Sequence, residues 1–191
     1  MSKRAVIFVD IQNDYFPGGK WTLHAMEAAA DNAAELLDSA RRKGDLVVHV
    51  RHEFPTAEAP FFSPGSEGSQ INVRVKNRDN EVVILKHHIN SYRETNLKEV
   101  LDKNGIEEVI ICGAMSHMCI DAVARASNDF GYKVSVVQDA CATRDLELNG
   151  QTIPAQQVHA AFMSALGFGY ATLLSTEDYL KEPTKAASPG F

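Results

Sequence analysis

The sequence is poor in cysteine, in long apolar runs and in basic charge, and each shortage argues against a class of protein. Three cysteines among 191 residues, without regular spacing, do not suggest a disulfide framework and favour a reducing compartment. No apolar run approaches the roughly 18 residues of a membrane-spanning helix, and the run at residues 5–9 meets Asp10 too early for a signal peptide. Nineteen basic and 25 acidic residues give a net charge of −6, which disfavours nucleic acid. We therefore expect a cytoplasmic domain that contacts neither membrane nor nucleic acid.

What the sequence does contain is an alternation of apolar strand patterns and amphipathic helix patterns. Strands are predicted at residues 4–10, 46–51, 82–85, 108–112, 133–137 and 171–174. Helices are predicted at 26–43, 97–103, about 119–130 and from Pro154 to about Leu166, with a last turn near 176–180. This order predicts an α/β fold with a six-stranded, mostly parallel sheet and helices on both faces. No linker divides the chain, so we expect one domain over residues 1–191, with a loose tail at 181–191.

Residues 52–80 contain no clear helix or strand pattern and are rich in proline, glycine and phenylalanine. Irregular segments of this length inside a compact domain are unusual and often functional. The segment is therefore predicted to be a lid or binding loop, or else a solvated insertion or an oligomer contact, and the sequence does not decide between these.

Three polar residues stand where predicted strands end. Asp10 follows the first strand, Lys86 the third, and Cys119 lies shortly after the fourth. Singly, each has a common structural explanation: a turn cap, a solvated boundary residue and a small buried hydrophobe. Together, at the carboxyl edge of a parallel sheet, they form a chemical scheme, because a carboxylate can take a thiol proton and an ammonium can stabilise both anions.

The residues around Cys119 predict an activated thiol. Ser116 is a candidate N-cap, which would place Cys119 in the first turn of a helix. Unpaired backbone N–H groups and the positive end of the helix dipole there would favour the thiolate. Backbone N–H groups of residues 115–119 could also form an oxyanion hole.

At this point the chain resembles the isochorismatase-like cysteine hydrolases. The resemblance rests on four blocks in the family's order, at residues 5–16, at Lys86 with residues 90–97, at 113–119, and at 158–161 through 169–171. It implies a Rossmann-like three-layer sandwich whose Asp–Lys–Cys triad cleaves carbon–nitrogen bonds of small amides or ureido compounds. It makes Cys119 the nucleophile, Asp10 the general base and Lys86 their electrostatic partner, working through a thioester. It also implies a cis peptide bond between Ala114 and Met115 that helps to aim the oxyanion donors around Cys119.

Aromatic and histidine side chains near this rim are candidates for the substrate pocket. Tyr92 matches an aromatic residue that often lines the pocket in the family, and Phe16 and Trp21 lie in the loop after Asp10. His117 lies beside the oxyanion turn. Each could instead fill an oligomer contact or face solvent.

We expect no metal and no cofactor. The zinc-containing nicotinamidases of the family place an aspartate and two histidines after the second strand, whereas here that region offers only His49 and His52, without an Asp-x-His pair. The expected partner is a small amide-type substrate. The resemblance also implies a homo-oligomer, either a dimer or a tetramer.

The leading interpretation is thus a thiol-dependent hydrolase of a small amide. The alternatives are a non-catalytic, metabolite-binding member of the same fold, a nicotinamidase-type amidase, and a cysteine redox sensor, with Cys112 or Cys141 as the candidate resolving partner.

Overall fold

A parallel sheet of six strands forms the centre of the molecule in a computed structural model that describes residues 3–56 and 58–181. In spatial order the strands are β3, β2, β1, β4, β5 and β8, and every neighbouring pair is parallel. Their bounds are β1 (Arg4–Val9), β2 (Leu46–His52), β3 (Val82–Lys86), β4 (Glu108–Ala114), β5 (Lys133–Ala142) and β8 (Thr172–Leu174). The predicted α/β class and six-stranded sheet are confirmed.

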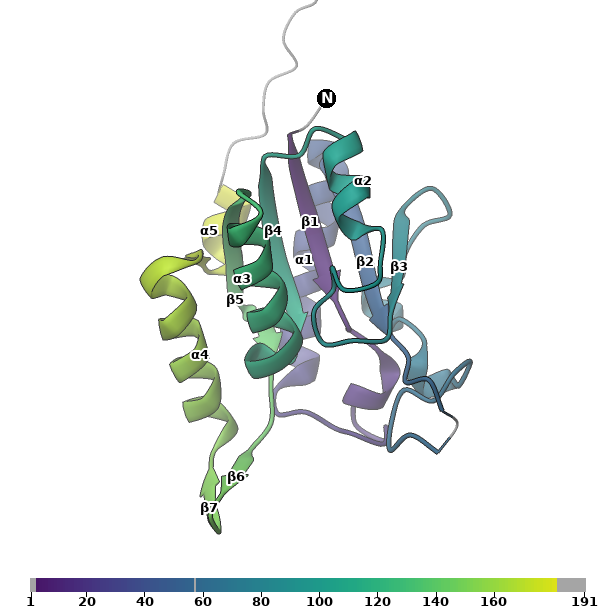
Figure 1. Cartoon of the computed structure of the whole chain (residues 1–191), viewed down its shortest axis with the longest axis vertical. Coiled ribbons are helices and arrows are strands. Elements are labelled where there is room, and N and C mark those ends of the chain that lie inside the picture. Colours follow the sequence, from purple (N-terminus) through teal and green to yellow (C-terminus); the bar gives the residue numbers. More distant parts are fainter. Residues whose placement is uncertain (1–2, 57, 182–191) are drawn as a thin grey trace, which may run out of the picture.

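Helices cover both faces of the sheet (Figure 1). One face packs against α1 (Met26–Lys43) and α5 (Thr176–Lys181), the other against α2 (Leu97–Lys103), α3 (Asp121–Asp129) and α4 (Ala155–Gly169). Strand β1 shows why: Val6 and Phe8 join the core under α1, whereas Ile7 and Val9 join the core under α2 and α3. A strand buried on both faces needs apolar residues at every position, as residues 5–9 have. The three-layer sandwich follows from this pattern.

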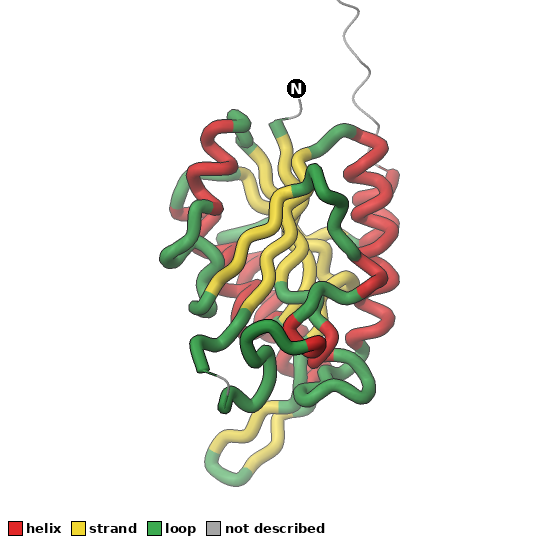
Figure 2. Tube along the Cα trace, turned by 90° about the vertical axis from the view of Figure 1, so that its right-hand side faces the viewer, coloured by secondary structure: helices red, strands yellow, loops and turns green. Residues whose placement is uncertain are grey.

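The structure differs from the sequence prediction where short polar segments form strands. β5 continues to Ala142, and the segment expected to be a polar loop contains an antiparallel hairpin of β6 (Leu146–Leu148) and β7 (Gln151–Ile153). This hairpin extends away from the main sheet at one end of the molecule (Figure 2). α4 continues through both glycines that were expected to follow it. The predicted tail at 181–191 lies outside the described residues except for Lys181.

Residues 52–80 fold back against the loop after β1. In the described part of this segment there are two short 3-10 turns, Glu67–Ser69 and Val73–Val75. The Gln12 side chain donates to the carbonyls of His52 and Ser69, both at 2.8 Å, and the Asp14 carboxylate accepts from the Phe62 amide at 2.7 Å. No helix in the described part of the chain is long and apolar enough to cross a membrane.

The strand order places the carboxyl end of β1 at a switch point. The chain runs from β1 outward to β2 and β3 and then returns to the other side of β1 as β4. Crossovers therefore diverge between β1 and β4, which is where ligands bind in open α/β sheets. Asp10 follows β1 at this point, and Cys119 lies beyond the end of β4.

Candidate active site

Asp10, Lys86 and Cys119 meet at the carboxyl edge of the sheet. The Lys86 Nζ atom lies 2.8 Å from Asp10 Oδ2 and 3.2 Å from Cys119 Sγ. Asp10 and Lys86 have no exposed side-chain surface, and Cys119 is 3% exposed. The fold thus brings three side chains, separated by up to 109 positions in the sequence, into contact through Lys86.

The backbone at the end of β1 turns sharply to present Asp10. Asp10 has a φ of +52°, in the left-handed region that few residues other than glycine adopt, and its amide donates to the Val50 carbonyl at 2.9 Å. Gly113 of the neighbouring strand has a φ of +125°, and a Cβ atom there would overlap the Val9 carbonyl. Only glycine lets β4 approach β1 this closely, beside a break in the pairing of β4 with β5.

Cys119 lies in the first turn of a helix, as predicted, but this turn is π-helical and not α-helical. Residues Ser116–Ile120 form a π-helical turn, and α3 begins only at Asp121. The predicted N-cap role of Ser116 is wrong, because its hydroxyl instead contacts the Ala142 carbonyl at 3.3 Å and His159 Nδ1 at 2.8 Å. The peptide bond between Ala114 and Met115 is cis, as the resemblance implied. The Met118 and Ile120 amides both donate to the Met115 carbonyl, which occupies two of the N–H groups near the cysteine.

Burial keeps the Cys119 thiol protonated. Burial and the neighbouring Asp10 charge raise the pKa of Cys119 to about 12, against the opposing effect of Lys86. Burial also raises the pKa of Asp10, although Lys86 and Cys119 act in the other direction. Burial alone would lower the pKa of Lys86, but the charges of Asp10 and Cys119 outweigh it and raise that pKa. Desolvation thus outweighs Lys86 and favours the protonated thiol, against the features around Cys119 that were expected to favour the thiolate.

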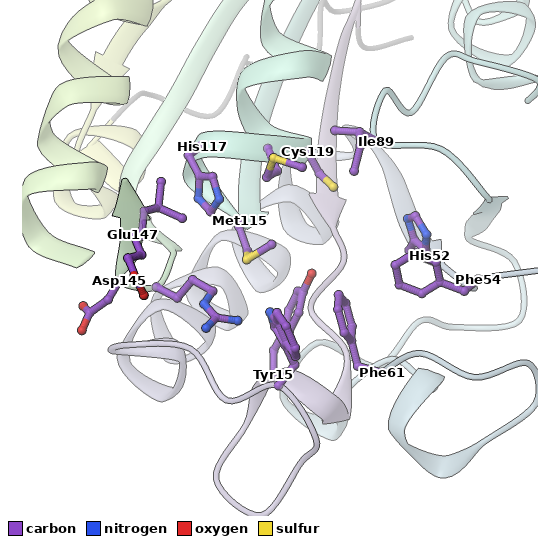
Figure 3. Close-up of a pocket in the computed structure, with 14 residues that line it drawn as sticks. Tyr15, His52, Phe54, Phe61, Ile89, Met115, His117, Cys119, Asp145 and Glu147 are labelled. Atoms are coloured by element: carbon purple, nitrogen blue, oxygen red, sulfur yellow. The ribbon is translucent and has the colours of Figure 1, made fainter. Parts of the chain in front are cut away.

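A largely apolar cavity of about 400 Å³ opens next to Cys119. Figure 3 shows Cys119, Met115 and His117 along one side of it, with Tyr15 and Phe61 facing them. Its wall consists of Tyr15, Trp21, His52, Phe54, Phe61, Ile89, Met115, His117, Met118, Cys119, Arg144, Asp145, Leu146 and Glu147. Such a cavity suits a small molecule with a flat apolar part.

Two of the four predicted pocket residues line this cavity. Trp21 stacks on Phe61 with ring centroids 4.7 Å apart, and the Arg144 guanidinium lies 4.2 Å from the centre of its ring. His117 lies in the wall and contacts the Thr143 hydroxyl through Nδ1 at 2.6 Å.

Phe16 and Tyr92, the other two predicted pocket residues, do not line this cavity. Phe16 is 5% exposed and belongs to the core under α1, with the Arg74 guanidinium 5.5 Å from its ring centre. Tyr92 turns away from the cavity toward α3, where its hydroxyl contacts Ser127 Oγ at 2.8 Å and its ring packs edge-on against Phe130. The orientation of both side chains is decided by contacts with residues that are distant in the sequence.

The sequence analysis missed several wall residues. Tyr15, Phe54, Phe61 and Arg144 all line the cavity, and two of them come from the segment 52–80. Of the alternatives for that segment, these contacts favour a binding loop over a solvated insertion. A cluster of aromatic residues in an otherwise irregular stretch was the available signal.

His49 and His52 do not converge on a common point. The His49 ring stacks on Phe8 inside the sheet and its Nε2 lies 3.1 Å from Glu81, whereas His52 Nδ1 lies 3.0 Å from the Lys86 ammonium. Within the described residues no three His, Cys, Asp or Glu side chains cluster as metal ligands would. The zinc arrangement of the nicotinamidases does not fit these residues.

Comparison with known proteins defines the class. The sequence model of the isochorismatase domain matches residues 4–176. The isochorismatase family protein YddQ of Bacillus subtilis is 47% identical over 93% of this chain and 98% of its own length. A crystal structure of an isochorismatase-family protein from Oleispira antarctica superposes with a TM-score of 0.90 at 54% identity, covering 93% of this chain and 95% of the other. The chain belongs to the isochorismatase family and is a hydrolase of that family.

More distant relatives carry the names of specific hydrolases. A streptothricin hydrolase of Streptomyces noursei is 30% identical over 86% of this chain and 59% of its own length. A maleamate amidohydrolase of Pseudomonas putida is 28% identical over 74% of this chain and 73% of its own length.

Proposed function

We propose that this protein is a thiol-dependent amidohydrolase that cleaves the carbon–nitrogen bond of a small amide or ureido compound through Cys119, Asp10 and Lys86. The contact of Lys86 Nζ with both Asp10 and Cys119, next to the cavity, carries the proposal. The maleamate amidohydrolase among the relatives, whose name denotes amide hydrolysis, supports the class of reaction.

The raised pKa values of Asp10 and Cys119 suit transfer of a proton between them. A carboxylate whose pKa is raised by burial is a stronger base than an ordinary one, and its charge acts directly on the Cys119 thiol. Lys86 stabilises whichever of the two is the anion, because its ammonium contacts both. The proton therefore moves inside a site of constant net charge.

The reaction follows in two halves. Asp10 takes the thiol proton as Cys119 Sγ attacks the amide carbonyl, and backbone N–H groups near Met115 and Cys119 stabilise the oxyanion. The tetrahedral intermediate expels the amine, which takes the proton from Asp10, and a thioester remains. Asp10 then removes a proton from water as the water attacks the thioester. Collapse releases the acid, and the proton returns to the thiol.

Trapping of the thioester tests this proposal. The purified protein is mixed with a panel of small amides and ureido acids, quenched in acid, and examined by intact mass spectrometry. We expect an acyl adduct on Cys119 in the wild type and none in Cys119→Ala, which should still bind the same compound. Binding by the wild type without any turnover would favour the non-catalytic, metabolite-binding alternative.

The redox alternative has less support, because oxidation-sensitive thiols have a low pKa whereas burial raises that of Cys119. A cytoplasmic location and assembly into a dimer or tetramer stay predictions.

A further inference from the structure

His52, the last residue of β2, contacts the triad and also lines the cavity. Its Nδ1 lies 3.0 Å from Lys86 Nζ, and the same Nζ lies 3.2 Å from Cys119 Sγ, so the ring is one contact away from the nucleophile. His52 also lines the cavity and is 5% exposed. Its second ring nitrogen, Nε2, is buried and has no hydrogen-bond partner among the described residues.

The Lys86 contact fixes which nitrogen of His52 carries the proton. An ammonium group only donates hydrogen bonds, so Nδ1 must accept, and a neutral imidazole then carries its proton on Nε2. Burial, followed by the charges of Lys86, His87 and His88, lowers the pKa of His52 to about 3, which keeps the ring neutral. Nε2 is therefore a hydrogen-bond donor at neutral pH.

The surroundings of His52 supply no acceptor for this donor. The ring packs against the aromatic rings of Phe54 and Phe62, with centroids 4.7 and 6.2 Å away. A buried N–H group without a partner is costly, and such groups in native structures call for an explanation. A ligand in the cavity that His52 lines is the explanation at hand.

We propose that His52 is a substrate-binding residue whose Nε2–H donates a hydrogen bond to an uncharged acceptor on the substrate, either a carbonyl oxygen or a ring nitrogen beside the scissile amide. This inference rests on the proposed function. The neutral donor and its apolar neighbours favour an uncharged acceptor over a carboxylate. The preferred substrate is then a compact amide with a flat apolar part and a second hydrogen-bond acceptor. The His52 Nε2–H group favours such a compound over analogues that lack the second acceptor.

Small aldehydes test this without requiring turnover. An aldehyde adds to the Cys119 thiol as a hemithioacetal, with the thiol proton going to the new hydroxyl, and so protects the cysteine from iodoacetamide. Benzaldehyde and the three pyridine carboxaldehydes have the same shape, but only the pyridines carry a ring nitrogen. The measured quantity is the protection constant of each pyridine relative to benzaldehyde, from mass spectrometry of the intact protein, with Cys119→Ser as the labelling blank.

Variants at His52 separate the donor from its surroundings. For each protein, the protection constant of each pyridine isomer is divided by that of benzaldehyde. For at least one isomer this ratio should be about tenfold higher in the wild type than in His52→Leu, as expected for the loss of one buried hydrogen bond. His52→Gln, whose amide can accept from Lys86 and also donate, should recover part of the difference. Phe54→Leu alters the same wall without removing a donor, so it should change all four constants in parallel. Should His52→Leu not fold, His52→Met replaces it.

A spectroscopic signature gives a second readout. In protein labelled with ¹⁵N-histidine, the Nε2 proton of His52 should shift downfield with the favoured pyridine aldehyde and not with benzaldehyde. If the ratio of pyridine to benzaldehyde protection constants is the same in the wild type and in His52→Leu for every isomer, the inference is overturned and the proposed function stays intact. Failure of all four aldehydes to protect wild-type Cys119 would contradict the proposed function and the inference with it.

Discussion

Asp10 and Lys86 form an ion pair of 2.8 Å in which both side chains are wholly buried. Two buried charges attract one another strongly, but both have lost their hydration. The net contribution of the pair to the free energy of folding is therefore small. The pair is therefore better explained by chemistry than by folding. Removing one partner should be worse for stability than removing both.

Lys86→Met should destabilise the fold by about 3–5 kcal/mol, because it leaves the buried Asp10 carboxylate without its partner. Adding Asp10→Asn should restore a large part of that stability, although amide hydrolysis stays lost in both proteins. Urea unfolding curves of the two single variants and the double variant measure this coupling. Lys98→Met is the control: it breaks an exposed pair with Asp102 and should cost less than about 1 kcal/mol. A loss in the double variant equal to the sum of the two single losses would show that the pair is not coupled.

Asp10→Asn should make Cys119 easier to ionise while abolishing turnover. The Asp10 charge is one cause of the raised thiol pKa, so its removal should lower that pKa from about 12, whereas Lys86→Met should raise it further. The rate of iodoacetamide labelling against pH, with Cys119→Ser as the blank, gives each apparent value. A wild-type thiol that labels with a pKa below the ordinary value of about 8.5 would contradict the buried, protonated resting state.

The sequence predicted the fold and the triad position because both depend on local patterns. Apolar runs define β1 and β4, and the residues that follow each strand, Asp10 at once and Cys119 five positions later, reach the same sheet edge. The protonation state of Cys119 could not be predicted from local sequence patterns. It depends on how deeply the folded chain buries the thiol and on the Asp10 and Lys86 charges placed beside it.

Gly113→Ala should cost far more than an ordinary glycine substitution. Gly113 has a φ of +125°, and a Cβ atom there would overlap the Val9 carbonyl, immediately before Asp10. We expect a loss of at least about 2–3 kcal/mol in the free energy of unfolding, and reduced hydrolysis in whatever protein folds, because β1 and β4 must separate. Gly105→Ala provides the matched control, since Gly105 also has a positive φ, +62°, but an added Cβ meets nothing within 4 Å. Similar losses at both positions would exclude the close approach as the cause.

Glu81 should make stability depend on pH in the acid range. Although burial works against it, hydrogen bonds from the Arg41 side chain, the Arg78 amide and His49 lower its pKa from 4.5 to about 2. A pKa that is lower in the folded state contributes stability that is complete above about pH 4.5 and is lost as the pH falls toward 2. Glu81→Gln should cost roughly 1–3 kcal/mol at neutral pH and reduce the acid dependence between those values.

Urea unfolding at several pH values measures the Glu81 effect. Glu99→Gln is the control, because Glu99 pairs with Lys103 at the surface, where its side chain is 61% exposed. It should change stability by no more than about 0.5 kcal/mol. If the free energy of unfolding of Glu81→Gln depends on pH as that of the wild type does, a carboxylate other than Glu81 is responsible for the acid dependence.

The cavity wall is the part of the site that sequence patterns predicted least well. Phe16 and Trp21 lie in one loop, yet one packs into the core and the other faces the cavity. Loop residues have no period that fixes the direction of a side chain, so partners distant in sequence decide it. For Trp21 those partners are Phe61 and Arg144, 40 and 123 positions away.

Substitutions of Tyr92 and Trp21 should therefore affect different properties. Tyr92→Phe removes the hydroxyl contact with Ser127 and should cost about 1 kcal/mol of stability, with KM and kcat unchanged. Trp21→Leu removes the ring that lies between Phe61 and Arg144 in the cavity wall, and should raise KM several-fold with a smaller effect on the unfolding midpoint. Steady-state kinetics on the amide identified by the thioester screen, together with urea unfolding of both variants, separates the two effects. A rise in KM for Tyr92→Phe would return Tyr92 to the substrate pocket and contradict the orientation of its side chain toward α3.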